Sequence, residues 1–297
     1  MNTSPERVDA VARLSGRLHE ALDQPVEGRT RADKILDLGV NAVGYTLRGT
    51  QSDDTAGRIL LSITHDQLER SGLGVEDPAY IQWPRYQAYI RGLKKAPAQK
   101  RTELNTFARQ YGAVERATLT TSHEKETNAR HAVHLMGWAV PYAMEMYPSL
   151  NPNKVALYAL NHDGIEAITG DTPSLDLSPM EHAAKVAKET AALFELEALI
   201  GEQFPQLFSL IKRYESLADR EAEFVKTADK ADPGFTHFKT RGLALVQDHQ
   251  IQSAEEFYAK IDVVTRRIMS YAHHFPEFLH DRDELTRRIA HITEWPH

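Results

Sequence analysis

Apolar residues recur at intervals of three and four along most of the chain, and this spacing predicts amphipathic α-helices. The first run consists of Val8, Val11, Leu14, Leu18 and Leu22. It follows Ser4-Pro5-Glu6, a sequence that is typical of a helix start. We therefore expect a helix near the beginning of the chain, with one face turned toward a core.

The same spacing predicts helices through the rest of the chain. They are expected at 35–43, 59–63, 79–93, 126–147, 153–169, 179–200, 218–230 and 254–274. Ser178-Pro179-Met180-Glu181 is a strong start signal, with a capping serine, a proline in the first turn and a glutamate three residues after the serine. The nearest approach to a strand is 117–121, which is short. The pattern predicts an all-α fold.

A polar, proline-containing stretch at 94–101 is the best candidate for a linker. Residues 1–100 carry 14 basic and 13 acidic side chains, whereas residues 101–297 carry 21 and 29. The acidity therefore belongs to the second part. We expect a helical N-terminal extension over 1–100 and a separate domain with C-terminal helices over 101–297.

Composition narrows the function classes. The 297 residues carry a net charge of −7, which argues against a protein held on a nucleic-acid polymer by phosphate contacts. The absence of cysteine excludes a disulfide scaffold, a thiolate metal site and a cysteine nucleophile. No apolar run is long enough for a membrane span, and the first residues do not resemble a signal peptide. We expect a cytoplasmic protein without a membrane partner.

The densest polar cluster inside an apolar pattern is His162-Asp163, followed by Glu166 and by Gly170-Asp171. On a continuous helix, Glu166 would share a face with His162 and Asp163. Buried imidazoles and carboxylates are costly unless something compensates them, and a divalent cation does so well. Two further segments offer suitable ligands: His131 in one predicted helix and Asp229 in another. Two imidazoles and two carboxylates would suit Mn²⁺, Co²⁺, Fe²⁺ or Ni²⁺.

The order His131, His162-Asp163, Asp229 resembles that of the HD-domain metal-dependent phosphohydrolases. Within that superfamily, His162-Asp163-x-x-Glu166-x-x-x-Gly170-Asp171 is similar to the signature of the 5′-deoxynucleotidase branch. The resemblance covers about 114–232. It implies a helical HD-domain bundle, a phosphohydrolase activity on nucleotides and, by default, a homodimer.

The resemblance also implies roles for individual residues. His131, His162, Asp163 and Asp229 would bind one divalent metal ion: Mn, Co, Fe, Ni or Mg. Glu166 would orient or deprotonate the attacking water. Arg116 lies 15 residues before His131, where the branch has its phosphate-binding arginine. Asp171 would contact the sugar or help the leaving oxygen.

Three departures concern the substrate pocket. Ala117 follows the arginine where the branch commonly has tryptophan, Arg130-His131-Ala132 replaces Glu-His-Ser, and the lysine that follows Gly-Asp in some members is missing after Asp171. His182 is the single histidine between Asp163 and Asp229, whereas the dinuclear members supply two there, so one metal ion is favoured.

The leading hypothesis is hydrolysis of a (deoxy)nucleoside 5′-monophosphate to nucleoside and phosphate. The alternatives are a deoxynucleoside triphosphate triphosphohydrolase and a non-catalytic HD module that senses a nucleotide.

Overall fold

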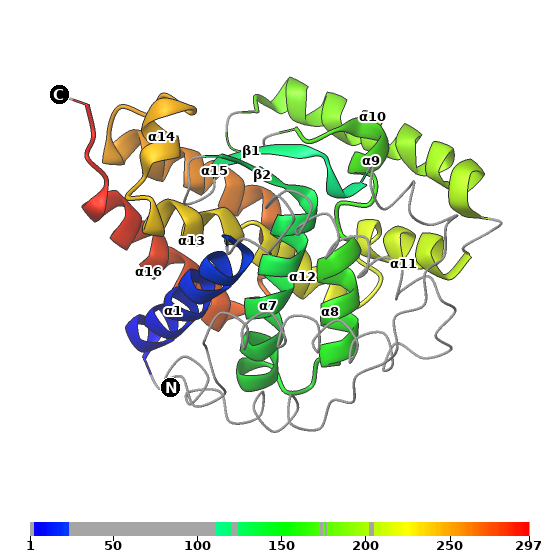
Figure 1. The fold of residues 1–297 in the computed structure, drawn as a ribbon, viewed down its shortest axis with the longest axis horizontal. Coiled ribbons are helices and arrows are strands. Elements are labelled where there is room, and N and C mark those ends of the chain that lie inside the picture. The colour runs from blue at the N-terminus through cyan, green and yellow to red at the C-terminus, as the bar shows by residue number, and fades with distance from the viewer. Residues whose placement is uncertain are drawn as a thin grey trace, which may run out of the picture.

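The computed structural model of the chain describes residues 3–23, 111–119, 124–172, 175, 177–201 and 205–296. Within these ranges the regular structure is helical apart from one short hairpin, which confirms the all-α prediction (Figure 1). The helices predicted at 35–43, 59–63 and 79–93, and the linker predicted at 94–101, lie outside the described residues.

The described helices and strands, in chain order, are α1 (Ser4–Asp23), β1 (Glu115–Leu119), β2 (Lys125–Thr127), α7 (Asn128–Met146), α8 (Pro152–Asn161), α9 (Glu166–Thr169), α10 (Pro179–Leu196), the π-helix η1 (Glu197–Gly201), α11 (Pro205–Glu215), α12 (Arg220–Asp229), α13 (Asp232–Lys239), α14 (Leu243–Gln247), α15 (Ala254–Ala272) and α16 (Pro276–Ile292).

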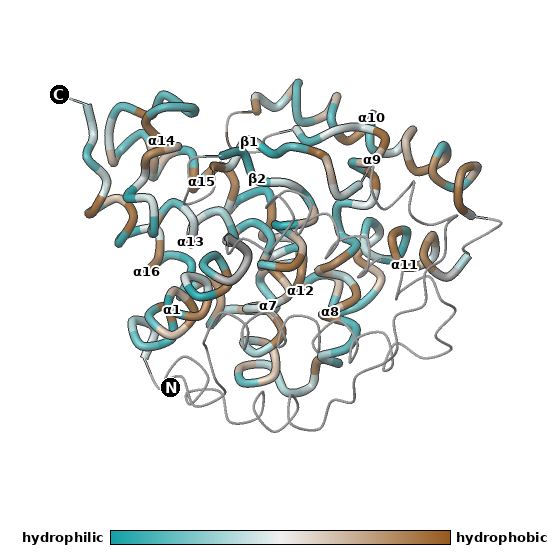
Figure 2. The backbone as a smooth tube through the Cα atoms, in the orientation of Figure 1, coloured by the Kyte–Doolittle hydropathy of each residue, from teal (hydrophilic) through white to brown (hydrophobic). Residues whose placement is uncertain are grey.

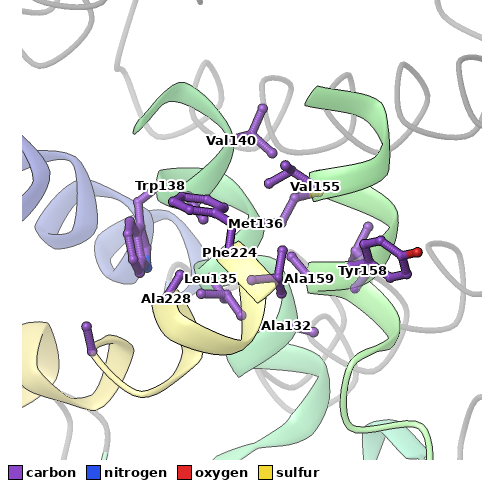
Figure 3. Close-up of a cluster of buried hydrophobic side chains, with 14 of the residues drawn as sticks. Ala132, Leu135, Met136, Trp138, Val140, Val155, Tyr158, Ala159, Phe224 and Ala228 are labelled. Atoms are coloured by element: carbon purple, nitrogen blue, oxygen red, sulfur yellow. The ribbon is translucent and has the colours of Figure 1, made fainter. Parts of the chain in front are cut away.

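The core is built around α7, which is buried on every side from Asn128 to Ala143. Alanines on this helix let α8 and α12 approach closely, Gly137 leaves room for Leu18 of α1, and larger side chains fill the remaining space. Figure 3 shows Leu135 and Phe224 in this cluster, and Trp138 on the side of α7 that faces away from α8. Because α7 is buried on every side, it is the central helix of the bundle.

The β1–β2 hairpin corrects the expectation that no strand would form. The strands pair antiparallel with Glu115 opposite Thr127 and Leu119 opposite Lys125, with an irregularity between these pairs. Strands of five and three residues are too short to show a reliable alternation of apolar and polar positions, so the pattern did not reveal them. The hairpin leads directly into α7, whose first turn is capped by Thr127.

The expected helix over 153–169 is also corrected. Helix α8 ends at Asn161, a turn follows, and the four-residue α9 begins at Glu166. Backbone bonds from the Gly164 amide to the Asn161 carbonyl and from the Glu166 amide to the Asp163 carbonyl tighten this turn. By contrast, α10 begins at Pro179 as predicted, with a reciprocal capping box between Ser178 and Glu181.

Helix α1 packs against α7 and α16 and contributes to the same hydrophobic core (Figure 1). Its Arg7 guanidinium donates to both carboxylate oxygens of Asp281 on α16, at 2.7 Å each. The first helix of the chain is thus joined to the helices of the second part, through apolar packing and a buried ion pair. The division near residue 100 stays a prediction.

Helix α10 lies at the periphery and is the most exposed long helix of the described chain. Figure 2 shows hydrophobic residues along it, and Met180 and Phe194 are 81% and 71% exposed. In the described ranges no helix is both long and apolar enough to cross a membrane.

Candidate metal centre

His131, His162 and Asp229 come together at the centre of the bundle, although 98 residues separate the first from the last. All three are buried, and one ligand atom from each lies within 4.8 Å of the others. His131 Nε2 is 3.0 Å from Asp229 Oδ1, and His162 Nε2 is 3.5 Å from the same oxygen. The three residues come from α7, from the C-terminal cap of α8 and from the last position of α12.

Asp163, the fourth expected ligand, lies at the edge of this group. Its Oδ2 atom is 2.9 Å from His162 Nε2 and 2.5 Å from Arg116 Nη1. Burial opposes the charge of Asp163, but His162 and Arg116 outweigh burial and hold the pKa of the Asp163 carboxyl well below its ordinary range. The carboxylate is therefore anionic and shared between an imidazole and a guanidinium.

This donor set fits a divalent cation. Two imidazole nitrogens and carboxylate oxygens about 3 Å from them form a compact N/O donor set of the kind that divalent transition metals bind. His162 Nδ1 lies 2.8 Å from the Ala159 carbonyl oxygen, which requires a proton on Nδ1 and leaves Nε2 as the metal-binding atom. That Nε2 atom is buried and makes no well-oriented hydrogen bond among the described residues, although Asp163 Oδ2 lies 2.9 Å away.

The carboxylates around His131 and His162 favour the protonated, positively charged form of both rings. Burial lowers the pKa of His162, but Asp163 and Asp229 outweigh burial and raise it to about 9. Burial and Arg116 likewise lower the pKa of His131, and the carboxylates of Asp232 and Asp229 raise it well above the usual histidine range. The carboxylates thus attract positive charge to both rings.

Glu166 and Arg116 flank the group. Glu166 Oε2 accepts a hydrogen bond from Asn128 Nδ2 at 2.9 Å and lies 3.7 Å from Arg116 Nη1. Burial, followed by the charge of Asp163, raises the pKa of Glu166 to about 7. Arg116 projects from β1, and its Nη1 also donates to Asn128 Oδ1 at 3.2 Å.

A cavity of about 430 Å³ opens beside these groups and is lined by Arg116, His162, Asp163, Glu166, Asp171 and Asp229. Asp171 lies just after Gly170, whose positive φ of 69° turns the chain at the end of α9. The structure thus brings six of the seven predicted site residues to the cavity wall. The seventh, His131, is not part of the cavity wall but contacts Asp229, which is.

Sequence reasoning missed three charged residues of the site. Lys230 Nζ contacts Asp229 Oδ2 at 2.5 Å. His131 Nδ1 lies 2.9 Å from Asp232 Oδ2 and 3.6 Å from Glu126 Oε2. These contacts are on the side of the ring opposite Nε2, the atom that faces Asp229. Asp232 is fully buried. No local signal singled out Glu126, because an acidic residue near the start of a helix is common.

Comparison with known proteins identifies the family of the chain. A family model described as HD domain matches residues 109–269, which is more than half of the chain. The chain belongs to the HD domain family. The matched range begins just before the hairpin and ends within α15, so α1 and α16 lie outside the matched HD domain.

Two similar proteins give more detail. A 5′-deoxynucleotidase of Vibrio parahaemolyticus is 34% identical over 83 residues, which are 27% of this HD-domain chain and 43% of that relative. The chain thus matches less than half the length of this curated relative. A crystal structure from Magnetospirillum magnetotacticum, described as a predicted metal-dependent phosphohydrolase, has a TM-score of 0.49 and 22% identity, and the match covers 65% of this chain and 95% of that one.

Proposed function

We propose that this HD domain is a metal-dependent phosphohydrolase that cleaves the phosphate ester of a (deoxy)nucleoside 5′-monophosphate. The observation that carries the proposal is the meeting of His131, His162 and Asp229 beside an arginine and a carboxyl group at one end of a cavity. The similarity to a 5′-deoxynucleotidase supports the nucleotide as substrate.

His131, His162, Asp163 and Asp229 would hold the cation. When bound, a divalent cation supplies Lewis-acid chemistry, which stabilises negative charge on a phosphoryl oxygen and lowers the pKa of a water. Activity measured with each metal in turn has to identify the cation among Mn²⁺, Co²⁺, Fe²⁺, Ni²⁺ and Mg²⁺. One site is proposed, because His182, on the cavity wall, is the single additional histidine that the chain offers between Asp163 and Asp229.

The side chains on the cavity wall divide the remaining work. Arg116 can turn its fork from Asp163 to the phosphate, since a guanidinium engages two phosphoryl oxygens at once. Glu166, with a pKa of about 7, can accept the proton of an attacking water near neutral pH. The water oxygen bonds to phosphorus, the ester P–O bond breaks, and the nucleoside oxygen takes up a proton. Asp171 faces the cavity from the turn after α9, where we place the sugar and the leaving oxygen.

One observation favours a second substrate. Lys185, Lys230 and Arg267 line the same cavity, Lys230 in contact with Asp229, so three cationic side chains lie where additional phosphates could bind. A deoxynucleoside triphosphate could therefore place its β- and γ-phosphates there and release triphosphate. The two reactions differ in their products, which separates them experimentally.

The test is product analysis with a panel of nucleoside mono- and triphosphates in the presence of Mn²⁺, Co²⁺, Mg²⁺ or EDTA. Nucleoside and orthophosphate, lost with EDTA, are expected from a monophosphate, and triphosphate release would identify the second substrate class. Glu166→Gln should remove turnover while Mn²⁺ binding persists. Glu181→Gln, the same change on the exposed start of α10, serves as the control. Nucleotide binding without any turnover would refute the proposal and favour a sensor module.

We also propose a homodimer and a cytoplasmic location. The exposed apolar side chains of α10 give an association surface that sedimentation analysis can test with Phe194→Ser.

We retain the expectation of an N-terminal part over 1–100 and an HD part over 101–297, with α1 docked on the second.

A further inference from the structure

A line of buried polar groups runs from helix α1 to the proposed metal ligand His131. Ser15 Oγ on α1 lies 2.9 Å from His134 Nε2, and His134 Nδ1 lies 2.8 Å from Asp232 Oδ1. The other carboxylate oxygen of Asp232, Oδ2, is 2.9 Å from His131 Nδ1. Ser15, His131, His134 and Asp232 are each at most 1% exposed.

Every proton in this line has an assignable position. Trp138 Nε1 can only donate, and it donates to Asp232 Oδ1 at 2.5 Å, so that oxygen acts as an acceptor. His134 therefore carries a proton on Nδ1 and, when neutral, accepts the Ser15 hydroxyl proton at Nε2.

The same reasoning fixes the state of His131. With an anionic carboxylate 2.9 Å from Nδ1, the neutral ring keeps its proton on Nδ1 and presents the Nε2 lone pair toward Asp229 and the metal position. Glu126, Asp232 and His131 Nδ1 also form a compact acidic group. A neutral histidine offers one lone pair, which here is on Nε2, so this second group supports the ligand and does not hold a second cation.

We propose that Asp232 is the positioning residue for His131, and that α1 takes part in the metal site through Ser15 and His134. The proposal assigns a functional contact to a helix outside the matched HD domain range. It rests on the proposed metal site but not on the proposed reaction. Its test measures metal binding alone, so a protein that binds Mn²⁺ normally but hydrolyses nothing would refute the reaction and leave this inference standing.

The test is Mn²⁺ affinity of the full chain, measured by the electron paramagnetic resonance of free Mn²⁺ after EDTA treatment and dialysis. Loss of a carboxylate that orients a metal-bound histidine weakens metal affinity by about 10- to 100-fold. Asp232→Asn should show this loss. Ser15→Ala removes one hydrogen bond further along the line and should weaken affinity by about two- to tenfold.

Two variants are matched controls. Asp281→Asn makes the same chemical change at another buried aspartate, and this one anchors α1 through Arg7 without contact to His131. Ser4→Ala removes the other buried serine of α1, whose hydroxyl contacts the His280 carbonyl. Both should retain the wild-type Mn²⁺ affinity.

Two results would overturn the proposal: wild-type Mn²⁺ affinity in Asp232→Asn, or the same loss in Asp281→Asn, which would reflect a loosened bundle. Should Asp232→Asn fail to fold, the comparison of Ser15→Ala with Ser4→Ala decides alone.

Nitrogen-15 NMR of the Zn²⁺-loaded protein gives a second readout. The wild type should show His134 as the Nδ1–H tautomer, and Ser15→Ala should shift His134 toward a mixture. An unchanged tautomer in Ser15→Ala would also refute the line.

Discussion

Glu166 makes the stability of the metal-free protein depend on pH in a predictable direction. Burial and the nearby charge of Asp163 raise its folded-state pKa from 4.5 to about 7. Below pH 4.5 the Glu166 carboxyl is protonated in both the folded and the unfolded state, so it does not change the free energy of unfolding. Between pH 4.5 and 7 the unfolded chain releases the proton first, so stability falls as pH rises. At about 1.4 kcal/mol per pH unit, the loss reaches about 3 kcal/mol above pH 7.

Glu166→Gln removes this ionisation while it keeps the size of the side chain and an oxygen for Asn128. In EDTA, the variant and the wild type should therefore have similar free energies of unfolding at pH 5, and the variant should be more stable by up to about 3 kcal/mol at pH 8. Urea unfolding, followed by circular dichroism from pH 5 to 8, measures this difference.

The control is the same substitution at Glu181, where the sign reverses. Hydrogen bonds from the Ser178 hydroxyl and amide lower the pKa of this exposed carboxyl, so the wild type gains stability as pH rises through the carboxyl range. Glu181→Gln should therefore be less stable than the wild type by an amount that stays nearly constant from pH 5 to 8. A difference between wild type and Glu166→Gln that does not change from pH 5 to 8 would refute the electrostatic picture of the site.

Three further outcomes follow from the same geometry. Arg116→Lys keeps the charge but loses the two-pronged contact, and kcat/KM for the nucleotide should fall by about 10- to 100-fold in steady-state assays; an unchanged value would exclude the phosphate role. In the metal-free protein His162 has a pKa of about 9, so Mn²⁺ has to displace a proton and its apparent affinity should rise by up to tenfold per pH unit between pH 7 and 9. Calorimetry in two buffers of different ionisation enthalpy measures the released proton, and binding without proton release would contradict the prediction. Mn²⁺ at 100 times its Kd should raise the free energy of unfolding by about 2.7 kcal/mol, and Asp229→Asn should abolish that gain in thermal unfolding.

The sequence allowed the helical class and most long helices to be predicted, because each buries one face and shows a three-to-four spacing. Capping chemistry located the start of α10 to the residue, since Ser178, Pro179 and Glu181 act locally. The order of His131, His162-Asp163 and Asp229 placed the candidate ligands on three elements, and the structure brings these elements together.

Other features depend on contacts between distant segments and had no local signal. The break between α8 and α9 keeps His162, Asp163 and Glu166 near one another by a tight turn, where a continuous helix was expected. The hairpin is too short to be seen as an alternation, yet it carries Arg116 and Glu126 to the site. Asp232, just after the helix predicted over 218–230, could have been a solvated helix end, and only the folded structure shows that it faces His131.

The charges at the centre explain why a cation belongs there. Five carboxyl groups converge on this small volume: Glu126, Asp163, Glu166, Asp229 and Asp232. Arg116 and Lys230 are the permanent cations that contact them in the described part of the site. Burial makes the excess negative charge costly, so the metal-free protein takes up protons on His131, His162 and Glu166, as their raised pKa values indicate.

A divalent cation and these protons compete for the same negative charge. Metal binding should therefore displace the Nε2 protons of the two histidines and lower the pKa of Glu166, which turns Glu166 into the carboxylate that a proton-accepting role requires. Loading the site with metal would in this way also set the charge state of the proposed catalytic base. The inference connects the stability measurements to the reaction: the pH-dependent difference between wild type and Glu166→Gln should shrink when Mn²⁺ is added, and its persistence in saturating Mn²⁺ would place the cation too far from Glu166 to act with it.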